Sequence, residues 1–256
     1  MLNLVRHGAP SGMPGLLVVH GLFGSARNWG AIARRLAQDR EVITVDMRNH
    51  GESFRTETHR YADMAQDLAE IIAAEGGPMD VLGHSMGGKA AMMLALNAPG
   101  LVDRLLVADI APVAYDHSQT HLIAAMQALP LAEITSRAQA DVALSQHVED
   151  ASVRAFLLQS LDLRADPMRW RLNLDVLARE MDQITGWPEV ARSFSGPCLF
   201  LAGGRSDYIQ PTHRPAIRAL FPNARFAKLP EAGHWLHAEA PQDFAETARM
   251  WFSRAP

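Results

Sequence analysis

One serine of the chain stands in a pattern that is typical of a catalytic nucleophile. Gly83-His-Ser-Met-Gly87 follows the apolar run 79–82 and precedes a helical pattern over 89–98, so Ser85 should occupy a turn between a strand and a helix. Glycines flank this serine because side chains there would collide with the neighbouring strand and helix. Taken without its context, the string 83–87 could also be a glycine-rich turn with no catalytic role. The position between strand and helix, and the additional Gly88, favour a nucleophile.

A serine hydroxyl needs a base that removes its proton during attack and later protonates the leaving group, and histidine suits both steps. The chain has 11 histidines. His234, in Ala232-Gly-His-Trp235, follows the last apolar run, 225–229. It should therefore lie on a loop at the carboxyl edge of the sheet, and its place after the serine agrees with the usual chain order around such a turn. We predict that His234 is the base for Ser85.

The oxygen that becomes negatively charged during attack must be met by preorganised donors. Met86 offers a backbone N–H at the start of the helix that follows the serine. A second donor should come from His20-Gly-Leu-Phe-Gly24, which follows an apolar run. We expect Leu22 to supply this N–H, with Phe23 as the alternative. His20 is expected to brace the loop rather than to react.

The remaining pattern predicts the elements that position these groups. Short apolar runs alternate with amphipathic stretches, which is typical of an α/β fold with a mostly parallel sheet flanked by helices. Strands are expected at 16–20, 42–46, 79–82, 105–108, 198–202 and 225–229, and helices at 25–38, 61–75, 89–98 and 241–252. Since the carboxyl ends of parallel strands meet at one edge, the expected catalytic groups should meet there too.

The pattern changes between residues 115 and 188, where helical periodicity continues without a convincing strand. We therefore predict a core formed by residues 1–114 and 189–256, interrupted by an all-helical cap over 115–188. Five apolar cap residues are expected to roof the substrate pocket, although packing among cap helices is the simpler role for each. They are Leu122, Met126, Phe156, Leu157 and Leu161.

The bulk properties are those of an ordinary globular protein. A length of 256 residues suits one α/β catalytic domain. The net charge of −4 gives no attraction for phosphate backbones or anionic membranes, so neither nucleic acid nor a membrane is an expected partner. Nothing in the composition indicates a cofactor, a metal or a particular oligomeric state.

The redox and targeting signals are few. The single cysteine, Cys198, permits no intrachain disulfide and lies in an apolar run, so a buried thiol is expected. No segment approaches the roughly 20 apolar residues that span a bilayer. The polar start, residues 1–7, lacks the apolar core of a signal peptide. The expected location is the cytoplasm.

Five sequence strings, in order over nearly the whole chain, resemble the YbfF-like, ABHD11-like branch of the α/β-hydrolases. They are His20-Gly-Leu-Phe-Gly24, Asp46-Met-Arg-Asn-His-Gly-Glu-Ser53, Gly83-His-Ser-Met-Gly-Gly88, Ala108-Asp-Ile-Ala-Pro112 and Gly233-His-Trp-Leu-His237. The resemblance implies hydrolysis of short- and medium-chain acyl esters, with acyl-CoA thioesters also proposed for the branch. The expected partner is therefore a small-molecule acyl ester or thioester.

The acid that orients His234 has two candidates. Asp109 ends one apolar run, whereas Asp207 lies after a later run, at the position that most α/β-hydrolases use. The branch resemblance implies Asp109, because its members take the acid from an Asp-Ile-x-Pro segment and often carry a serine, here Ser206, near the usual acid position. We choose Asp109, with Ser206 as a helper that hydrogen-bonds within the network.

Several other functions fit parts of the pattern. Perhydrolases and carbon-carbon bond hydrolases use similar serine sites, and an α/β-hydrolase scaffold can bind a ligand without catalysis. Retention of every expected catalytic part argues against a non-catalytic scaffold. Dehalogenases and epoxide hydrolases need an aspartate where Ser85 stands. Arg6-His7-Gly8 resembles the start of histidine phosphatases, but the match is a tripeptide and we interpret it as coincidence.

Two groups of polar residues receive simpler interpretations. Residues 46–50 follow a strand and are expected to shape the pocket rim, and His237 is expected to be structural. Four cap arginines would meet a CoA phosphate, but pairing with nearby acids such as Asp162 and Asp166 is the simpler role. These arginines are Arg154, Arg164, Arg169 and Arg171.

Overall fold

The computed structural model describes residues 1–253. Its central sheet has seven strands in the order β1–β3–β2–β4–β5–β8–β9. β1 pairs antiparallel with β3, and the other five strand pairs are parallel. The strands are β1 (Asn3–His7), β2 (Leu16–Val19), β3 (Val42–Asp46), β4 (Met79–His84), β5 (Val102–Ala108), β8 (Cys198–Gly203) and β9 (Ala224–Leu229). All six predicted strands are present.

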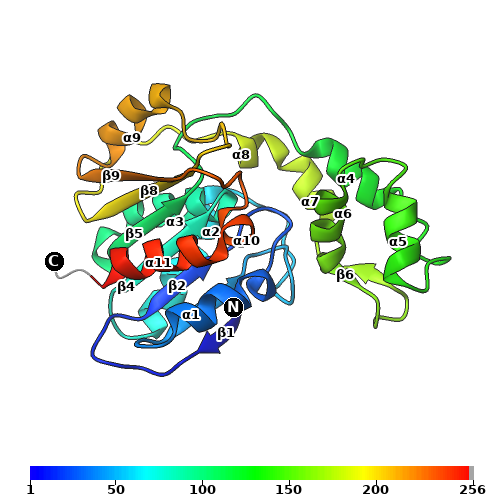
Figure 1. Ribbon diagram of the computed structural model, residues 1–256, viewed down its shortest axis with the longest axis horizontal. Coiled ribbons are helices and arrows are strands. Elements are labelled where there is room, and N and C mark those ends of the chain that lie inside the picture. Colours follow the sequence, from blue (N-terminus) through cyan, green and yellow to red (C-terminus); the bar gives the residue numbers. More distant parts are fainter. Residues whose placement is uncertain (254–256) are drawn as a thin grey trace.

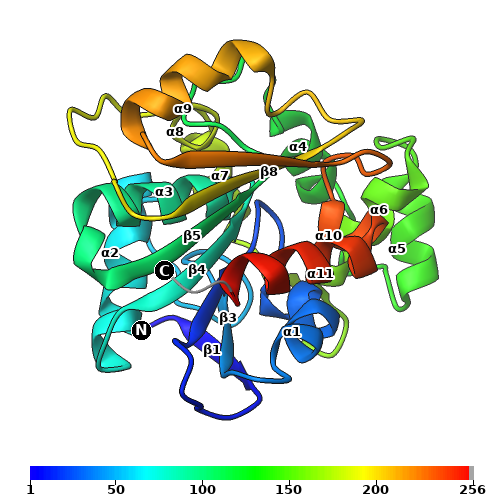
Figure 2. The ribbon, with the colours of Figure 1, turned by 60° about the vertical axis from the view of Figure 1, so that its left-hand side comes forward.

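Helices cover both faces of the sheet (Figures 1 and 2). The first expected helix begins as a 3-10 turn before α1, and α3 begins at Met86 rather than at residue 89. One face carries α1 (Gly30–Leu36) and α11 (Pro241–Phe252), which follows the short α10 (Leu236–Glu239). The other carries α2 (Tyr61–Ala74), α3 (Met86–Asn97) and α9 (Arg214–Leu220).

Neighbouring residues of the central strands contribute to two different cores. Leu82 and Leu106 pack in the core beneath α1 and α11, whereas Val81 and Val107 pack in the core beneath α2 and α3. Because both faces of the sheet are covered, the inner parallel strands are mostly apolar on both faces. This explains why the sequence showed them as continuous apolar runs rather than as alternating patterns.

The segment between β5 and β8 forms a separate group of helices beside the sheet (Figure 1). Its helices are α4 (Thr120–Gln127), α5 (Arg137–Leu144), α6 (Ala151–Leu157), α7 (Leu174–Arg179) and α8 (Met181–Thr185). A two-stranded ladder, β6 (Leu161–Asp162) with β7 (Arg169–Trp170), interrupts the helices. The expectation of purely helical structure missed this ladder, because two-residue strands are too short to produce an alternating pattern.

We refer to residues 115–188 as the cap. The division of the chain at 114/115 and 188/189 stays a prediction. Residues 254–256, at the end of the expected second core segment, lie outside the described residues.

The polar start of the chain forms an edge strand that the sequence analysis did not predict. β1 lies at the end of the sheet, where Val5 is 40% exposed, so its residues lack the apolar character of the central strands. Its antiparallel pairing places His7 opposite Val42, the first residue of β3. His7 therefore lies at the amino edge of the parallel strands, opposite to the edge that carries Ser85.

Two further expectations concern burial and membrane spans. Cys198 is a fully buried free thiol whose pKa is raised by burial, as expected for a residue of a central strand. Within residues 1–253, none of the helices has both the length and the apolar character needed to cross a bilayer.

Candidate active site

Ser85 occupies the sharp turn between β4 and α3. Its backbone has φ +52° and ψ −123°, a conformation that is strained for a non-glycine residue. The flanking glycines are required by close contacts, since a Cβ at Gly87 would lie 2.4 Å from the carbonyl oxygen of His20. A Cβ at Gly83 would lie 2.3 Å from the carbonyl oxygen of Gly87. The turn thus presents the Ser85 hydroxyl at the carboxyl edge of the sheet.

A continuous hydrogen-bonded chain joins three of the expected residues. His234, on the loop after β9, places Nε2 3.0 Å from Ser85 Oγ. Its Nδ1 lies 2.8 Å from Oδ2 of Asp109, which directly follows β5 and is fully buried. This arrangement allows the imidazole to accept the serine proton at Nε2 while the carboxylate holds the Nδ1 proton.

The Asp109 carboxylate has two more donors, one from the last residue of β8 and one from the turn after it. The backbone N–H of Gly203 donates to Oδ1 at 2.8 Å, and the Ser206 hydroxyl donates to Oδ2. Asp207, the next residue in this turn, is exposed and does not contact His234 within the described part of the chain. The structure therefore brings Asp109 and Ser206 to the histidine and leaves Asp207 outside the network.

The loop after β2 contains Leu22 and Phe23, the two candidates for the second oxyanion donor. Phe23 has φ +64°, and its N–H donates to Nε2 of His50 at 3.2 Å. Its carbonyl oxygen accepts the hydroxyl of Ser160, from the cap, at 2.8 Å. Leu22 and Met86 both line the cavity, and their N–H groups have no hydrogen-bond partner among residues 1–253. Leu22 rather than Phe23 thus has a free donor.

Two buried histidines hold this loop in place as neutral rings. His20 donates from Nδ1 to the carbonyl oxygen of Gly21 at 2.8 Å and accepts the Met47 N–H at Nε2, at 2.9 Å. His50 similarly donates from Nδ1 to the Arg48 carbonyl oxygen, at 3.0 Å. Burial lowers the pKa of both imidazoles, so each keeps one nitrogen free to accept a backbone N–H.

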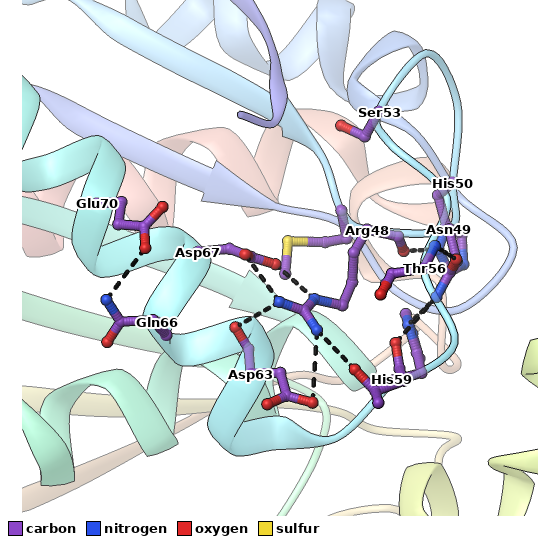
Figure 3. A network of polar contacts seen from close by, with 12 residues as sticks. Arg48, Asn49, His50, Ser53, Thr56, His59, Asp63, Gln66, Asp67 and Glu70 are labelled. Carbon is purple, nitrogen blue, oxygen red and sulfur yellow. Dashed lines mark hydrogen bonds and ion pairs between the residues drawn. The ribbon is translucent and has the colours of Figure 1, made fainter.

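The segment that carries His50 is fixed by polar contacts with α2 (Figure 3). The guanidinium of Arg48 binds both carboxylate oxygens of Asp67, at 2.6 and 2.8 Å. Asn49 donates to the Thr58 carbonyl oxygen at 3.1 Å. Residues 46–50 are expected at the pocket rim, but none of them lines the cavity. The contacts show that they lie behind the oxyanion loop and support it.

Two residues that contact His234 were not predicted from the sequence. The ring of Tyr208 stacks on the imidazole of His234, with centroids 3.9 Å apart and planes at 19°. His84 donates from Nε2 to the His234 carbonyl oxygen at 2.8 Å. Tyr208 could have been found from the sequence, because it lies two residues after the predicted helper Ser206 in the same turn. His237, expected to be structural, is buried and stacks on Trp29 with centroids 4.2 Å apart.

The serine faces a cavity of about 610 Å³ between the core and the cap. Of the five expected roof residues, Leu122, Phe156 and Leu157 line this cavity. Met126 and Leu161 are buried and do not line it. Buried apolar residues of both parts line the cavity, and the exposed residues His147, Glu149 and Asp150 of the cap line it as well.

The four cap arginines do not reach the cavity. Arg154 pairs with Asp141 at 2.8 Å, and Arg171 pairs with Asp162 at 3.0 Å. None of the four is a lining residue, and the exposed lining residues of the cap include acidic side chains. Phosphate binding by these arginines therefore has no support from their positions.

Comparison with known proteins agrees with this geometry. Residues 14–241 match the family described as alpha/beta hydrolase fold, so the chain belongs to this family. It is similar to a solved marine microorganism esterase, with a TM-score of 0.93, 34% identity and 98% coverage of both chains.

Two curated relatives define the branch. The chain is 44% identical over 251 residues to sn-1-specific diacylglycerol lipase ABHD11 of Mus musculus, which covers 94% of this chain and 81% of the relative. It is 39% identical to esterase YbfF of Escherichia coli K12, covering 93% of this chain and 92% of the relative. The chain is thus a serine ester hydrolase of the YbfF/ABHD11-like branch. The names of these relatives favour ester hydrolysis over the perhydrolase, carbon-carbon hydrolase and non-catalytic alternatives.

Proposed function

We propose that the protein hydrolyses carboxylic esters with short- to medium-chain acyl groups through an acyl-enzyme on Ser85. The observation that carries the proposal is the hydrogen-bonded chain from Ser85 Oγ through His234 to Asp109, at 3.0 and 2.8 Å. Ser85, at one end of these hydrogen bonds, lines a cavity large enough for a small substrate.

In the first half of the reaction, Ser85 Oγ attacks the ester carbonyl carbon while His234 Nε2 accepts the hydroxyl proton. The carbonyl oxygen becomes an oxyanion, which the backbone N–H groups of Leu22 and Met86 stabilise. Asp109 stabilises the imidazolium and keeps the remaining proton on Nδ1. Collapse of the intermediate breaks the ester C–O bond, and the imidazolium protonates the departing alkoxide.

In the second half, water attacks the acyl-enzyme, and His234 accepts its proton. The second tetrahedral intermediate expels Ser85 Oγ, which recovers its proton from the imidazolium, and the carboxylic acid leaves. Ser206 is a positioning residue here, because its hydroxyl bond to Asp109 fixes the carboxylate against His234.

The cavity supports the preference for short and medium chains. Its volume of about 610 Å³ must hold the acyl group, the reacting carbonyl and the alcohol together. Acyl thioesters present the same carbonyl to the serine and remain part of the proposed substrate class. The cap arginines give no reason to prefer a CoA thioester, because none lines the cavity. Parallel assays with p-nitrophenyl esters and acyl-CoAs of equal chain length separate the two.

A fluorophosphonate probe tests the covalent step. We expect wild type to be labelled at Ser85 and Ser85→Ala to remain unlabelled. Turnover of p-nitrophenyl butyrate by Ser85→Ala should fall by several orders of magnitude, because the members of a triad act as a unit. Undiminished ester hydrolysis by a folded Ser85→Ala variant would refute the proposed function.

A further inference from the structure

A buried lysine on the helix that follows the nucleophile takes no part in the proposed chemistry. Lys89 lies one turn after Ser85 on α3, is 1% exposed and lines the cavity. It is the only lysine or arginine among the lining residues, and within residues 1–253 no carboxylate pairs with it. A buried charge without an acidic partner is unfavourable, so its other contacts indicate its role.

The Lys89 ammonium binds the end of α8, the last helix of the cap. Nζ donates to the carbonyl oxygens of Thr185 at 2.9 Å and Gly186 at 2.6 Å. Carbonyls at a helix end lack intrahelical partners and accept well from a cation. The rings of Tyr115 and Tyr61, with centroids 4.8 and 5.6 Å from Nζ, contribute their π faces. Burial lowers the pKa of Lys89 to about 7.

The same two tyrosines also hold the end of α8. The Tyr61 hydroxyl, from α2, donates to the Ile184 carbonyl oxygen at 2.5 Å. The Tyr115 backbone N–H, from the segment after β5, donates to the Thr185 carbonyl oxygen at 3.1 Å. We call Lys89 with these two tyrosines the α8 clasp. Two core helices, α2 and α3, and the first residue of the cap therefore bind three consecutive carbonyls at the end of one cap helix.

α8 forms part of the cavity wall, where Met181, Ile184 and Thr185 are lining residues. Met181 and Ile184 are buried, whereas the lining residues His147, Glu149 and Asp150 of the cap are exposed. During turnover the alcohol departs and water enters while the acyl group stays bonded to the serine. An apolar acyl chain is held best against the buried apolar residues of α8, so we assign the acyl group to this wall and the alcohol to the side of the exposed residues.

We propose that Lys89 determines acyl-chain specificity by holding α8 at a fixed distance from Ser85. The inference rests on the proposed acyl-enzyme function. Residues i and i+4 lie on the same face of a helix, and the Lys89 N–H donates to the Ser85 carbonyl oxygen at 3.0 Å. The clasp thus connects the wall that limits the acyl chain directly to the residue that carries this chain.

The test is the ratio of kcat/KM for p-nitrophenyl laurate to kcat/KM for p-nitrophenyl butyrate. Lys89→Met keeps the apolar stem but removes the donors to α8, so longer chains should fit. We expect the ratio to rise at least about tenfold, the scale on which pocket size discriminates methylenes. Lys228→Met is the matched control, because Lys228 is the other lysine of the chain and is exposed on β9. Its ratio should equal that of wild type.

An unchanged ratio in Lys89→Met, including a case in which both rates fall equally, would overturn the proposal. Fluorophosphonate labelling of Ser85 in the same variant separates this failure from failure of the acyl-enzyme mechanism. If Lys89→Met does not fold, the same ratio is measured for Tyr61→Phe. This variant removes only the hydrogen bond from the Tyr61 hydroxyl to the Ile184 carbonyl oxygen. We expect its ratio to rise by a smaller factor, and an unchanged ratio would then overturn the proposal.

Discussion

At the scale of single residues, Asp109 and Asp207 differ in what they touch. Asp109 is buried against His234, whereas Asp207 is exposed. Asparagine keeps the shape but removes the charge that stabilises the imidazolium. We expect Asp109→Asn to lose on the order of 10⁴ in kcat, and Asp207→Asn to retain substantial activity in the same p-nitrophenyl butyrate assay. The reverse result would move the acid to Asp207 and leave Ser85 and His234 in their roles.

A second residue-scale prediction concerns His50, which accepts the Phe23 N–H behind the oxyanion loop. In His50→Leu this buried N–H loses its acceptor, which should lower the free energy of unfolding by about 1–3 kcal/mol. We also expect kcat to fall by up to about 100-fold with little change in KM, because the loop no longer aims the Leu22 N–H accurately.

His7→Ala is the control for that experiment, and it also tests the phosphatase-like tripeptide. His7 lies at the amino edge of the parallel strands, so we expect esterase kinetics equal to wild type. A His50→Leu enzyme with wild-type kcat would show that the oxyanion loop does not need this support.

At the scale of elements, the sequence predicted what depends on local pattern. Each central strand was recognisable because burial on both faces gives it a run of consecutive apolar residues. β1 was missed because an edge strand such as Asn3–His7 is partly exposed and polar. The contacts of Tyr208 with His234, and of Ser160 with Phe23, join residues far apart in the chain. Such contacts depend on how elements pack, which no local pattern encodes.

The α8 clasp leads to an element-scale prediction about pH. Burial lowers the pKa of Lys89 from 10.5 to about 7. Between these values the unfolded chain binds a proton that the folded chain lacks, so this residue's contribution to stability rises with pH. Below about 7 both states are protonated, and the full unfavourable effect of burying the charge is present. Tyr61 and Tyr115, which face the ammonium, have pKa values raised by burial and stay neutral in the folded state.

The measurement is denaturant unfolding of wild type and Lys89→Met between about pH 6 and about pH 9, below the range in which unfolded tyrosines ionise. We expect the free energy of unfolding of wild type, relative to the variant, to increase across this range. A constant difference would show that the lysine stays charged in the folded protein at every pH measured.

At the scale of the whole molecule, neither the core nor the cap contains the cavity by itself. Ser85 and Met86 come from the core, and Leu122, Phe156 and Leu157 come from the cap. A chain-length series of p-nitrophenyl esters should therefore show highest kcat/KM for short or medium acyl groups, with a decline for long ones. A preference for palmitoyl esters or triacylglycerols would mean that the cap leaves the pocket open.

The bond from Ser160 to the Phe23 carbonyl oxygen has a consequence for how such enzymes can be recombined. Through this bond the cap helps to fix the oxyanion loop, in addition to covering the cavity. Grafting a foreign cap onto this core would supply new walls but would omit that hydroxyl unless the donor carried a serine at the matching place. Exchange of modules between relatives should therefore succeed most often when the cap and the loop after β2 are inherited together.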